Sequence, residues 1–289
     1  MIYRLLALNV DGTILQTNGK IHKSTKDAIE YVKQKGVYVT LVTSRSFPSA
    51  KKIAKALKLD STLITHGGAY IASEQGKPLV EKRIPEEITY EIVTFLEGFP
   101  CQIRIVHERF SLANKYKLNH NLLSSTVFTT GDPILYSQQF VDSVSEALLD
   151  EQLSPPKIEV YFEHEEDLAD AKEALKGMFT EIDMLLINPL RMDISPAGVS
   201  KLTGLTQLGN KLGITLKETV AISSGDEDID MIKASGLGVA MGNASMELKR
   251  EADWVTRTSN QQGVSYMVKE HFRKQHPIEF LRRMNILKQ

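Results

Sequence analysis

The sequence predicts an α/β protein with a doubly wound parallel sheet, into which a second, smaller α/β domain is inserted. The chain opens with an apolar strand that ends in a Gly-containing turn at residues 9–13 (NVDGT). Strands of this kind then alternate with helices that have one apolar face, and the alternation changes character between residues 83 and 189 before it resumes. Apolar runs bounded by Gly are typical of buried parallel strands, and strand-helix-strand order favours right-handed crossovers.

Length and composition agree with this prediction. A chain of 289 residues exceeds the usual size of a single hydrophobic core, so two domains are the default expectation. The net charge of -1 and the lack of a long basic run before the C-terminus argue against nucleic acid or an anionic membrane as a partner. The single cysteine, Cys101, excludes an internal disulfide and a multi-cysteine metal site.

The sequence also shows no pattern typical of a membrane span or a secretory signal. No stretch approaches the roughly 18 apolar residues of a membrane span, and the N-terminus lacks a basic region followed by an apolar run. We therefore expect a cytoplasmic protein.

The first part of the chain contains alternating elements with clear boundaries. Ser24 or Thr25 can cap a helix, and Gly36 is placed where a left-handed residue ends it. A second strand ends in residues 43–45 (TSR), and a third runs into residues 66–69 (HGGA). In order, we expect a helix from Ser24 or Thr25 to Gly36, a strand at 37–42, a helix from Pro48 and a strand at 63–65.

The middle of the chain predicts the inserted domain. We expect helices at 86–96, 137–149 and 165–178, and strands at 101–106, 157–162 and about 184–187. Two βαβ-like halves of this kind indicate an α/β cap domain. We therefore assign residues 1–82 and 190–289 to the core and residues 83–189 to the cap.

The last part of the chain returns to the doubly wound pattern. The expected elements are a helix at 199–212, a strand at 219–222, a polar loop at 223–230 (SSGDEDID), a helix around Met231, a strand at 238–241, a short helix around Glu247 and a strand at 254–256. The tail at 277–289 is amphipathic, and we expect it to pack on the body through Phe280, Leu281 and Met284.

Polar residues follow several of the predicted core strands. Asn9 and Asp11 follow the first strand, Thr43 follows the second, the acidic loop 223–230 follows a later one, and Lys201 lies near the start of a helix. Because the carboxyl ends of parallel strands meet at one edge of the sheet, we expect these groups to converge. Carboxylates, a hydroxyl and an ammonium group together suit a phosphate and a divalent cation.

With the inserted cap, the chain resembles the haloacid dehalogenase superfamily, specifically its Cof-type phosphatase branch. The resemblance rests on the stretches VDGT, VTSR, THGGA, DISPAGVSK and GLGVAMGNA, which are spread over nearly the whole chain. It implies a doubly wound core with an inserted C2-type cap, and hydrolysis of phosphomonoesters through an aspartyl-phosphate with Mg²⁺ as cofactor. The cap would supply substrate specificity.

The resemblance also implies a role for each matching residue. Position 9 is that of the nucleophile, Asp11 that of the acid and base, Thr43 that of the group that holds the phosphoryl, and Lys201 that of the neutralising ammonium. Mg²⁺ would bind the side chain at position 9, the carbonyl oxygen of Asp11 and a carboxylate of the fourth motif. The implied substrate-binding positions are Thr13, Ser44, Arg45, Gly67 and Gly68.

The chain departs from the family pattern at the nucleophile. Position 9 is Asn, whose neutral carboxamide is a poor nucleophile. Removing the nucleophile of another enzyme costs about 10⁶ in turnover. Ser44 and Gly67, where relatives usually have Gly and Asn, are milder departures beside the same site.

The fourth motif, usually Gly-Asp-x-x-Asn-Asp, allows two alignments. A literal match uses Gly225-Asp226 and Asp230, and needs an insertion before it and a deletion after it. The gap-free alignment, which we favour, puts Ser224 at the metal Asp and keeps only Asp228. Asn9 and Ser224 would then offer neutral oxygens to Mg²⁺, which prefers anionic ligands, so the metal site would be weak or absent unless Asp226 or Asp228 holds a displaced ion.

Three hypotheses follow. The first is a catalytically impaired or inactive family member that keeps Asp11, Thr43 and Lys201 and binds a small phosphorylated metabolite. The second is a low-rate, Mg²⁺-dependent sugar-phosphate or nucleotide phosphatase that uses Asp11 with Asp226 or Asp228. The third is a non-enzymatic, partner-binding protein with a vestigial cleft. We expect a monomer or a weak homodimer.

Overall fold

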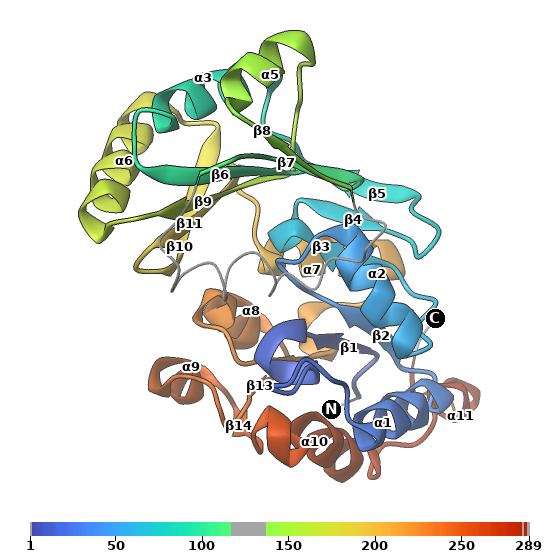
Figure 1. Cartoon of the computed structure of the whole chain (residues 1–289). Coiled ribbons are helices and arrows are strands. Elements are labelled where there is room, and N and C mark those ends of the chain that lie inside the picture. The colour runs from blue at the N-terminus through green and yellow to red at the C-terminus, as the bar shows by residue number, and fades with distance from the viewer. Residues whose placement is uncertain (1, 117–136, 285, 288–289) are drawn as a thin grey trace.

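The computed structural model describes residues 2–116, 137–284 and 286–287, and it consists of a core and a cap that lie one above the other in Figure 1. The core sheet has the strand order β14-β13-β12-β1-β2, and every pairing in it is parallel. Its strands are β1 (Leu5–Leu8), β2 (Tyr38–Leu41), β12 (Thr219–Ser223), β13 (Leu237–Ala240) and β14 (Trp254–Val255). The predicted doubly wound α/β core is confirmed.

Strand β1, between β12 and β2, is buried along its whole length because helices cover both faces of the sheet. Successive side chains of a strand point to opposite faces. Leu6 and Leu8 belong to one apolar cluster, together with residues of α1 (Lys23–Gln34), α2 (Phe47–Ala56) and α10 (Gly263–Phe272). Leu5 and Ala7 belong to another, with α7 (Lys201–Leu212), α8 (Ile229–Ala234) and α9 (Met246–Glu251).

The third predicted strand lies outside the parallel sheet. β3 (Leu63–Thr65) pairs antiparallel with β4 (Tyr70–Ala72), which pairs with β5 (Pro78–Glu81). A single parallel bridge between Val42 and Ile64 joins this small sheet to the core. α2 connects β2 to β3, and the chain reverses only after β3, where Gly67 and Gly68 adopt φ angles of 69° and 110° and lead into the hairpin with β4.

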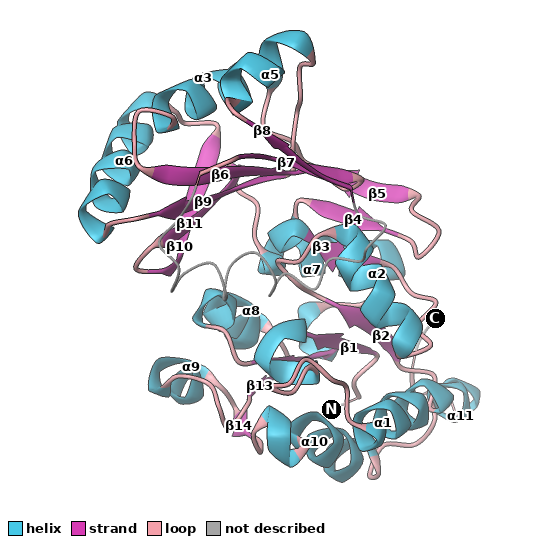
Figure 2. Ribbon diagram, viewed as in Figure 1, coloured by secondary structure: helices cyan, strands magenta, loops and turns pink. Residues whose placement is uncertain are grey.

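Over its described residues, the cap contains a six-stranded sheet in the order β10-β11-β9-β6-β7-β8. Its helices lie on the side of this sheet that faces away from the core (Figure 2). The cap strands are β6 (Cys101–Val106), β7 (Phe110–Asn114), β8 (Ser137–Val141), β9 (Lys157–Phe162), β10 (Ile182–Asn188) and β11 (Arg191–Pro196), and the helices are α3 (Glu86–Leu96), α5 (Val144–Asp150) and α6 (Glu165–Met178).

Two predictions about the cap are wrong. The helix expected at 137–149 begins only at Val144, because Ser143 caps it and accepts a hydrogen bond from the Glu146 amide, while residues 137–141 pair with β7 as a strand. β11, which the predicted boundary at residue 190 assigns to the core, pairs antiparallel with β9 and β10. The cap sheet therefore extends to Pro196.

The C-terminal segment packs on the core as α11 (Ile278–Arg283). Ile278 and Leu281 are buried in the core cluster, whereas Phe280 and Met284, expected on the apolar side, are 45% and 58% exposed. Among the described residues, no helix is both long enough and apolar enough to cross a membrane.

Candidate active site

Asn9 is bound into the turn that follows β1. The residue is 4% exposed. Its Oδ1 accepts a hydrogen bond from the Val10 amide at 2.8 Å, and its Nδ2 donates to the Asp11 carbonyl oxygen at 3.3 Å. Both ends of the carboxamide are therefore used to hold the turn.

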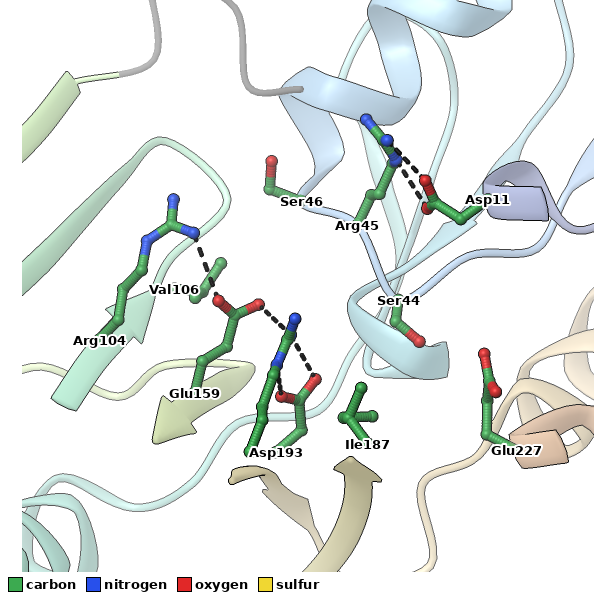
Figure 3. A pocket seen from close by; sticks show the side chains of 11 residues that line it. Asp11, Ser44, Arg45, Ser46, Arg104, Val106, Glu159, Ile187, Asp193 and Glu227 are labelled. Atoms are coloured by element: carbon green, nitrogen blue, oxygen red, sulfur yellow. Dashed lines mark hydrogen bonds and ion pairs between the residues drawn. The ribbon is translucent and has the colours of Figure 1, made fainter. Parts of the chain in front are cut away.

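Asp11 forms a bidentate ion pair with Arg45, which follows β2. Arg45 Nε donates to one carboxylate oxygen at 2.8 Å, and Nη2 donates to the other at 2.6 Å (Figure 3). The Asp11 side chain is 59% exposed, so this pair lies at the surface of the site. Arg45 also donates to Ser49 Oγ at 3.0 Å, which orients the guanidinium from α2. Two parallel hydrogen bonds of this kind give a defined geometry.

Ser224 connects the end of β12 to the same turn. Its hydroxyl donates to the Asp11 carbonyl oxygen at 3.0 Å and accepts from Thr13 Oγ1 at 3.3 Å. Asp226, in contrast, accepts a hydrogen bond from Ser245. The residue that touches the Asp11 carbonyl is thus Ser224, which favours the gap-free alignment of the fourth motif.

Lys201 is buried at the start of α7 and is paired with two carboxylates. Its Nζ lies 3.0 Å from Glu227 Oε1 and 3.0 Å from both oxygens of Asp228. Burial lowers the pKa of Lys201, but the charges of Asp228 and Glu227 outweigh burial and raise it. Burial, aided by the charge of Glu227, raises the pKa of Asp228 against the opposing effect of Lys201. Ser223 Oγ also donates to Asp228, at 2.5 Å.

Backbone hydrogen bonds join the loop after β2 to the hairpin after β3. Thr43 is buried, and its Oγ1 accepts from the Arg45 amide at 3.1 Å. The Gly67 amide donates to the Thr43 carbonyl oxygen at 3.1 Å. A Cβ atom on Gly68 would lie 2.2 Å from the Ser200 carbonyl oxygen, so only Gly lets the start of α7 approach this closely. That approach places Lys201 at the site.

Asn243, in the GLGVAMGNA stretch, was not predicted as a site residue. Its Nδ2 donates to the Gly12 carbonyl oxygen at 2.9 Å, and its Oδ1 accepts from the Ser259 amide at 2.9 Å. The length of the motif match pointed to this stretch, but the sequence did not indicate which of its side chains reaches the turn.

The donor groups at this edge do not fit a Mg²⁺ ion. In the part of the chain that the structure describes, no three His, Cys, Asp or Glu side chains are grouped as a metal site. Asn9 and Ser224 are neutral and bonded to the turn, and Asp11 is paired with Arg45. Asp228 is paired with Lys201. Mg²⁺ needs anionic oxygens in octahedral geometry, and each nearby carboxylate is already bound to a side chain of the protein.

A pocket of about 290 Å³ lies between this edge of the core and the cap. The core contributes Asp11, Ser44, Arg45, Ser46 and Glu227. The cap contributes Arg104, Val106, Glu159, Ile187, Arg191 and Asp193 (Figure 3). These cap residues come from four strands, β6, β9, β10 and β11, whose pairing no local sequence pattern reveals.

The charged side chains that the cap contributes to the pocket, which form its cap wall, are connected to one another by ion pairs. Glu159 lies 3.3 Å from Arg104 and 3.1 Å from Arg191, and Arg191 Nε donates to Asp193 at 2.9 Å. The positive charges of Lys157, Arg191 and Arg104 outweigh the burial of Glu159 and hold its pKa well below the usual range. The cap wall is therefore charged and preorganised.

The model of the haloacid dehalogenase-like hydrolases matches residues 6–268. The chain belongs to this family. It is 52% identical to the stress response protein YhaX of Bacillus subtilis, over 97% of each chain. This haloacid dehalogenase-like chain is also 28% identical to the 5-amino-6-(5-phospho-D-ribitylamino)uracil phosphatase YcsE of the same organism, over 92% of this chain and 94% of YcsE.

A solved structure supports the assignment. BT1666 from Bacteroides thetaiotaomicron, described among the phosphatases of this superfamily, matches with a TM-score of 0.78 at 26% identity, over 93% of this chain and 95% of its own. The predicted membership of the superfamily and the α/β core with a cap are confirmed. The roles of the individual site residues remain predictions.

Proposed function

We propose that this haloacid dehalogenase-like protein binds a small phosphorylated metabolite between core and cap without hydrolysing it. The observation that carries the proposal is the state of Asn9. Its carboxamide stands at the nucleophile position, is buried, and is hydrogen-bonded at both ends to the backbone of its own turn. A neutral group held in this way has no free anionic oxygen with which to attack phosphorus.

The nearby carboxylates do not replace the missing nucleophile. Asp228 is fully buried against Lys201 and Ser223, and Asp226 bonds to Ser245. Neither contact directs a carboxylate toward position 9. No observation therefore favours the low-rate phosphatase that would use Asp226 or Asp228 to bind Mg²⁺.

The pocket offers three guanidinium groups to a ligand phosphate. Arg45, Arg104 and Arg191 line it beside four carboxylates, those of Asp11, Glu159, Asp193 and Glu227, and a phosphate would replace a carboxylate as the partner of a guanidinium group through paired hydrogen bonds. Because the Asp11–Arg45 pair is partly exposed, it contributes at most about 1 kcal/mol, and a ligand phosphate can take the place of Asp11 at little cost. A volume of about 290 Å³ is near the lower end of the range for small-molecule sites.

Relatives support a phosphate ester as the ligand class. YcsE is named as a phosphatase of a phosphorylated ribityl compound. A cytoplasmic location, and a monomer or weak homodimer as the oligomeric state, remain predictions. The partner-binding alternative would leave the pocket without a ligand.

The test compares Mg²⁺-dependent hydrolysis of a panel of sugar phosphates and a chromogenic phosphate ester by three proteins: the native chain, Asn9→Asp, and Asn9→Asp with Ser224→Asp. We expect background rates for the native chain and hydrolysis only when carboxylates are restored. The same esters should raise the melting temperature of the native chain. Turnover by the native chain would overturn the proposal, and esters that bind none of the three proteins would favour the partner-binding alternative.

A further inference from the structure

A buried lysine of the cap reaches into the core. Lys157 is the first residue of β9, and its side chain is 3% exposed. Its Nζ donates a hydrogen bond to the backbone carbonyl oxygen of Ser44 at 2.8 Å. This bond joins the cap directly to the loop that follows β2.

The cap holds this ammonium group in place. Lys157 Nζ lies 2.6 Å from Glu159 and 3.1 Å from Asp193, whose side chains are 5% and 6% exposed. Arg191 bonds to the same two carboxylates. A buried charge is tolerated only when it is paired and hydrogen-bonded. The two carboxylates pair with the charge of Lys157. The Ser44 carbonyl oxygen accepts a further hydrogen bond, and it belongs to the core and not to the cap.

The loop at 43–45 depends on this contact for one of its three carbonyl groups. The Thr43 carbonyl oxygen accepts from the Gly67 amide at 3.1 Å, and the Arg45 carbonyl oxygen accepts from the His66 amide at 2.9 Å. Both of those donors belong to the core. The central carbonyl group, that of Ser44, is held by Lys157 of the cap. The conformation of a loop with three site residues, Thr43, Ser44 and Arg45, is thus shared between the domains.

We propose that Lys157 is a positioning residue that couples closure of the cap to the conformation of loop 43–45. With the cap in the position seen here, Lys157 holds the Ser44 carbonyl group, and Thr43 and Arg45 on either side are set at the pocket. When the cap moves away, the loop loses this restraint, and Arg45 loses its defined approach to Asp11. The proposal concerns the ligand-free protein and does not rest on the proposed function.

A simpler role for Lys157 would be to neutralise Glu159 and Asp193 within the cap. The two roles differ in what they do to the core. If Lys157 serves only the cap, its removal changes the cap sheet and leaves the loop of the core unaffected. If it positions the loop, its removal loosens backbone amides that lie in the other domain.

Hydrogen exchange of the full chain separates these roles. In Lys157→Met, we expect the amides of Arg45, His66 and Gly67 to exchange about tenfold faster than in the native chain, since a charge-assisted hydrogen bond to the loop is lost. Lys157→Arg keeps a donor and should restore most of the protection. Lys115→Met is the matched control, because Lys115 is an exposed cap lysine paired with Asp142.

Rates are normalised to the amides of β1, so that a general loss of stability is recognised. Faster exchange confined to the amides of the cap would overturn the proposal. An increase in the exchange rates of the loop amides that is no larger than the increase in β1 would overturn it as well. So would a Lys157→Arg variant that exchanges as fast as Lys157→Met. Hydrolysis plays no part in this measurement, so the outcome is independent of the test of the proposed function.

Discussion

The hydroxyl of Ser224 donates a hydrogen bond to the carbonyl oxygen of Asp11 across a distance of 3.0 Å. In the family arrangement, a Mg²⁺ ion would connect these two positions. Here a direct bond ties the turn to β12, and Thr13 and Asn9 add further hydrogen bonds. A dication and two carboxylates carry no net charge together, so their replacement by two neutral side chains leaves the charge of the site unchanged.

The first prediction is that Mg²⁺ does not stabilise the native chain. In Asn9→Asp with Ser224→Asp, the new carboxylates repel each other without metal and bind it when it is present, so the melting temperature should rise with Mg²⁺. At a Mg²⁺ concentration of a hundred times the Kd, binding raises the free energy of unfolding of this variant by about 2.7 kcal/mol. Thermal melting in Mg²⁺ and in EDTA at equal ionic strength measures this. A Mg²⁺-dependent rise in the native chain would show that another ligand set holds the metal.

The second prediction concerns the buried ion pair at the start of α7. Lys201→Met leaves Asp228 and Glu227 without their cation, and we expect it to lower the free energy of unfolding by about 3–5 kcal/mol. The raised pKa of Lys201 means that its contribution is complete at neutral pH and is lost only as the pH rises through that pKa. Urea unfolding measures the loss. Lys233→Met, which removes an exposed pair with Glu251, is the control and should leave the urea midpoint nearly unchanged, because solvent screens an exposed pair.

The third prediction compares two neighbouring glycines with left-handed φ angles. Gly67→Ala meets no atom within 4 Å of its new Cβ and should cost only the conformational strain, about 1–2 kcal/mol. Gly68→Ala places Cβ 2.2 Å from the Ser200 carbonyl oxygen, so the start of α7 must shift. We expect an additional loss of about 1–3 kcal/mol in the unfolding free energy. Equal losses would show that the contact is relieved without moving α7.

The fourth prediction is a pH dependence that arises from His66. Burial, aided by the charge of Lys157, lowers the pKa of His66 to about 3. The unfolded chain takes up a proton near the ordinary pKa of about 6.5, so stability falls as the pH drops below that value, by at most about 1.4 kcal/mol per pH unit.

His66→Asn should remove this slope, because Asn tolerates the φ of 52° and does not titrate. Urea midpoints between about pH 7 and about pH 5 measure the difference between the two proteins. Parallel pH profiles would show that His66 is protonated as readily in the folded chain as in the unfolded one.

Local patterns in the sequence were sufficient for the strongly periodic elements and for the location of the site. The helix at 86–96 and the strands at 101–106 and 157–162 were predicted with the bounds that the structure shows, because their apolar periodicity is strong. Asn9, Asp11, Thr43 and Lys201 were expected at one edge of the sheet and lie there, since the carboxyl ends of parallel strands meet. Short or mixed strands such as β7 and β11 lack such a pattern and were missed.

The partners of the site residues were decided by the tertiary structure alone. Arg45 with Asp11, Lys201 with Asp228, and Lys157 with the Ser44 carbonyl oxygen are pairs that span 27 to 113 positions of sequence. The gap-free alignment of the fourth motif was already favoured by its spacing in the sequence, and the contact between Ser224 and the Asp11 carbonyl oxygen adds a structural argument for it. Such pairs depend on how sheets and helices pack against one another, whereas propensity and periodicity report only on neighbours along the chain. The sequence by itself therefore determined the fold and the residue types at the site, and packing determined how each charge is satisfied.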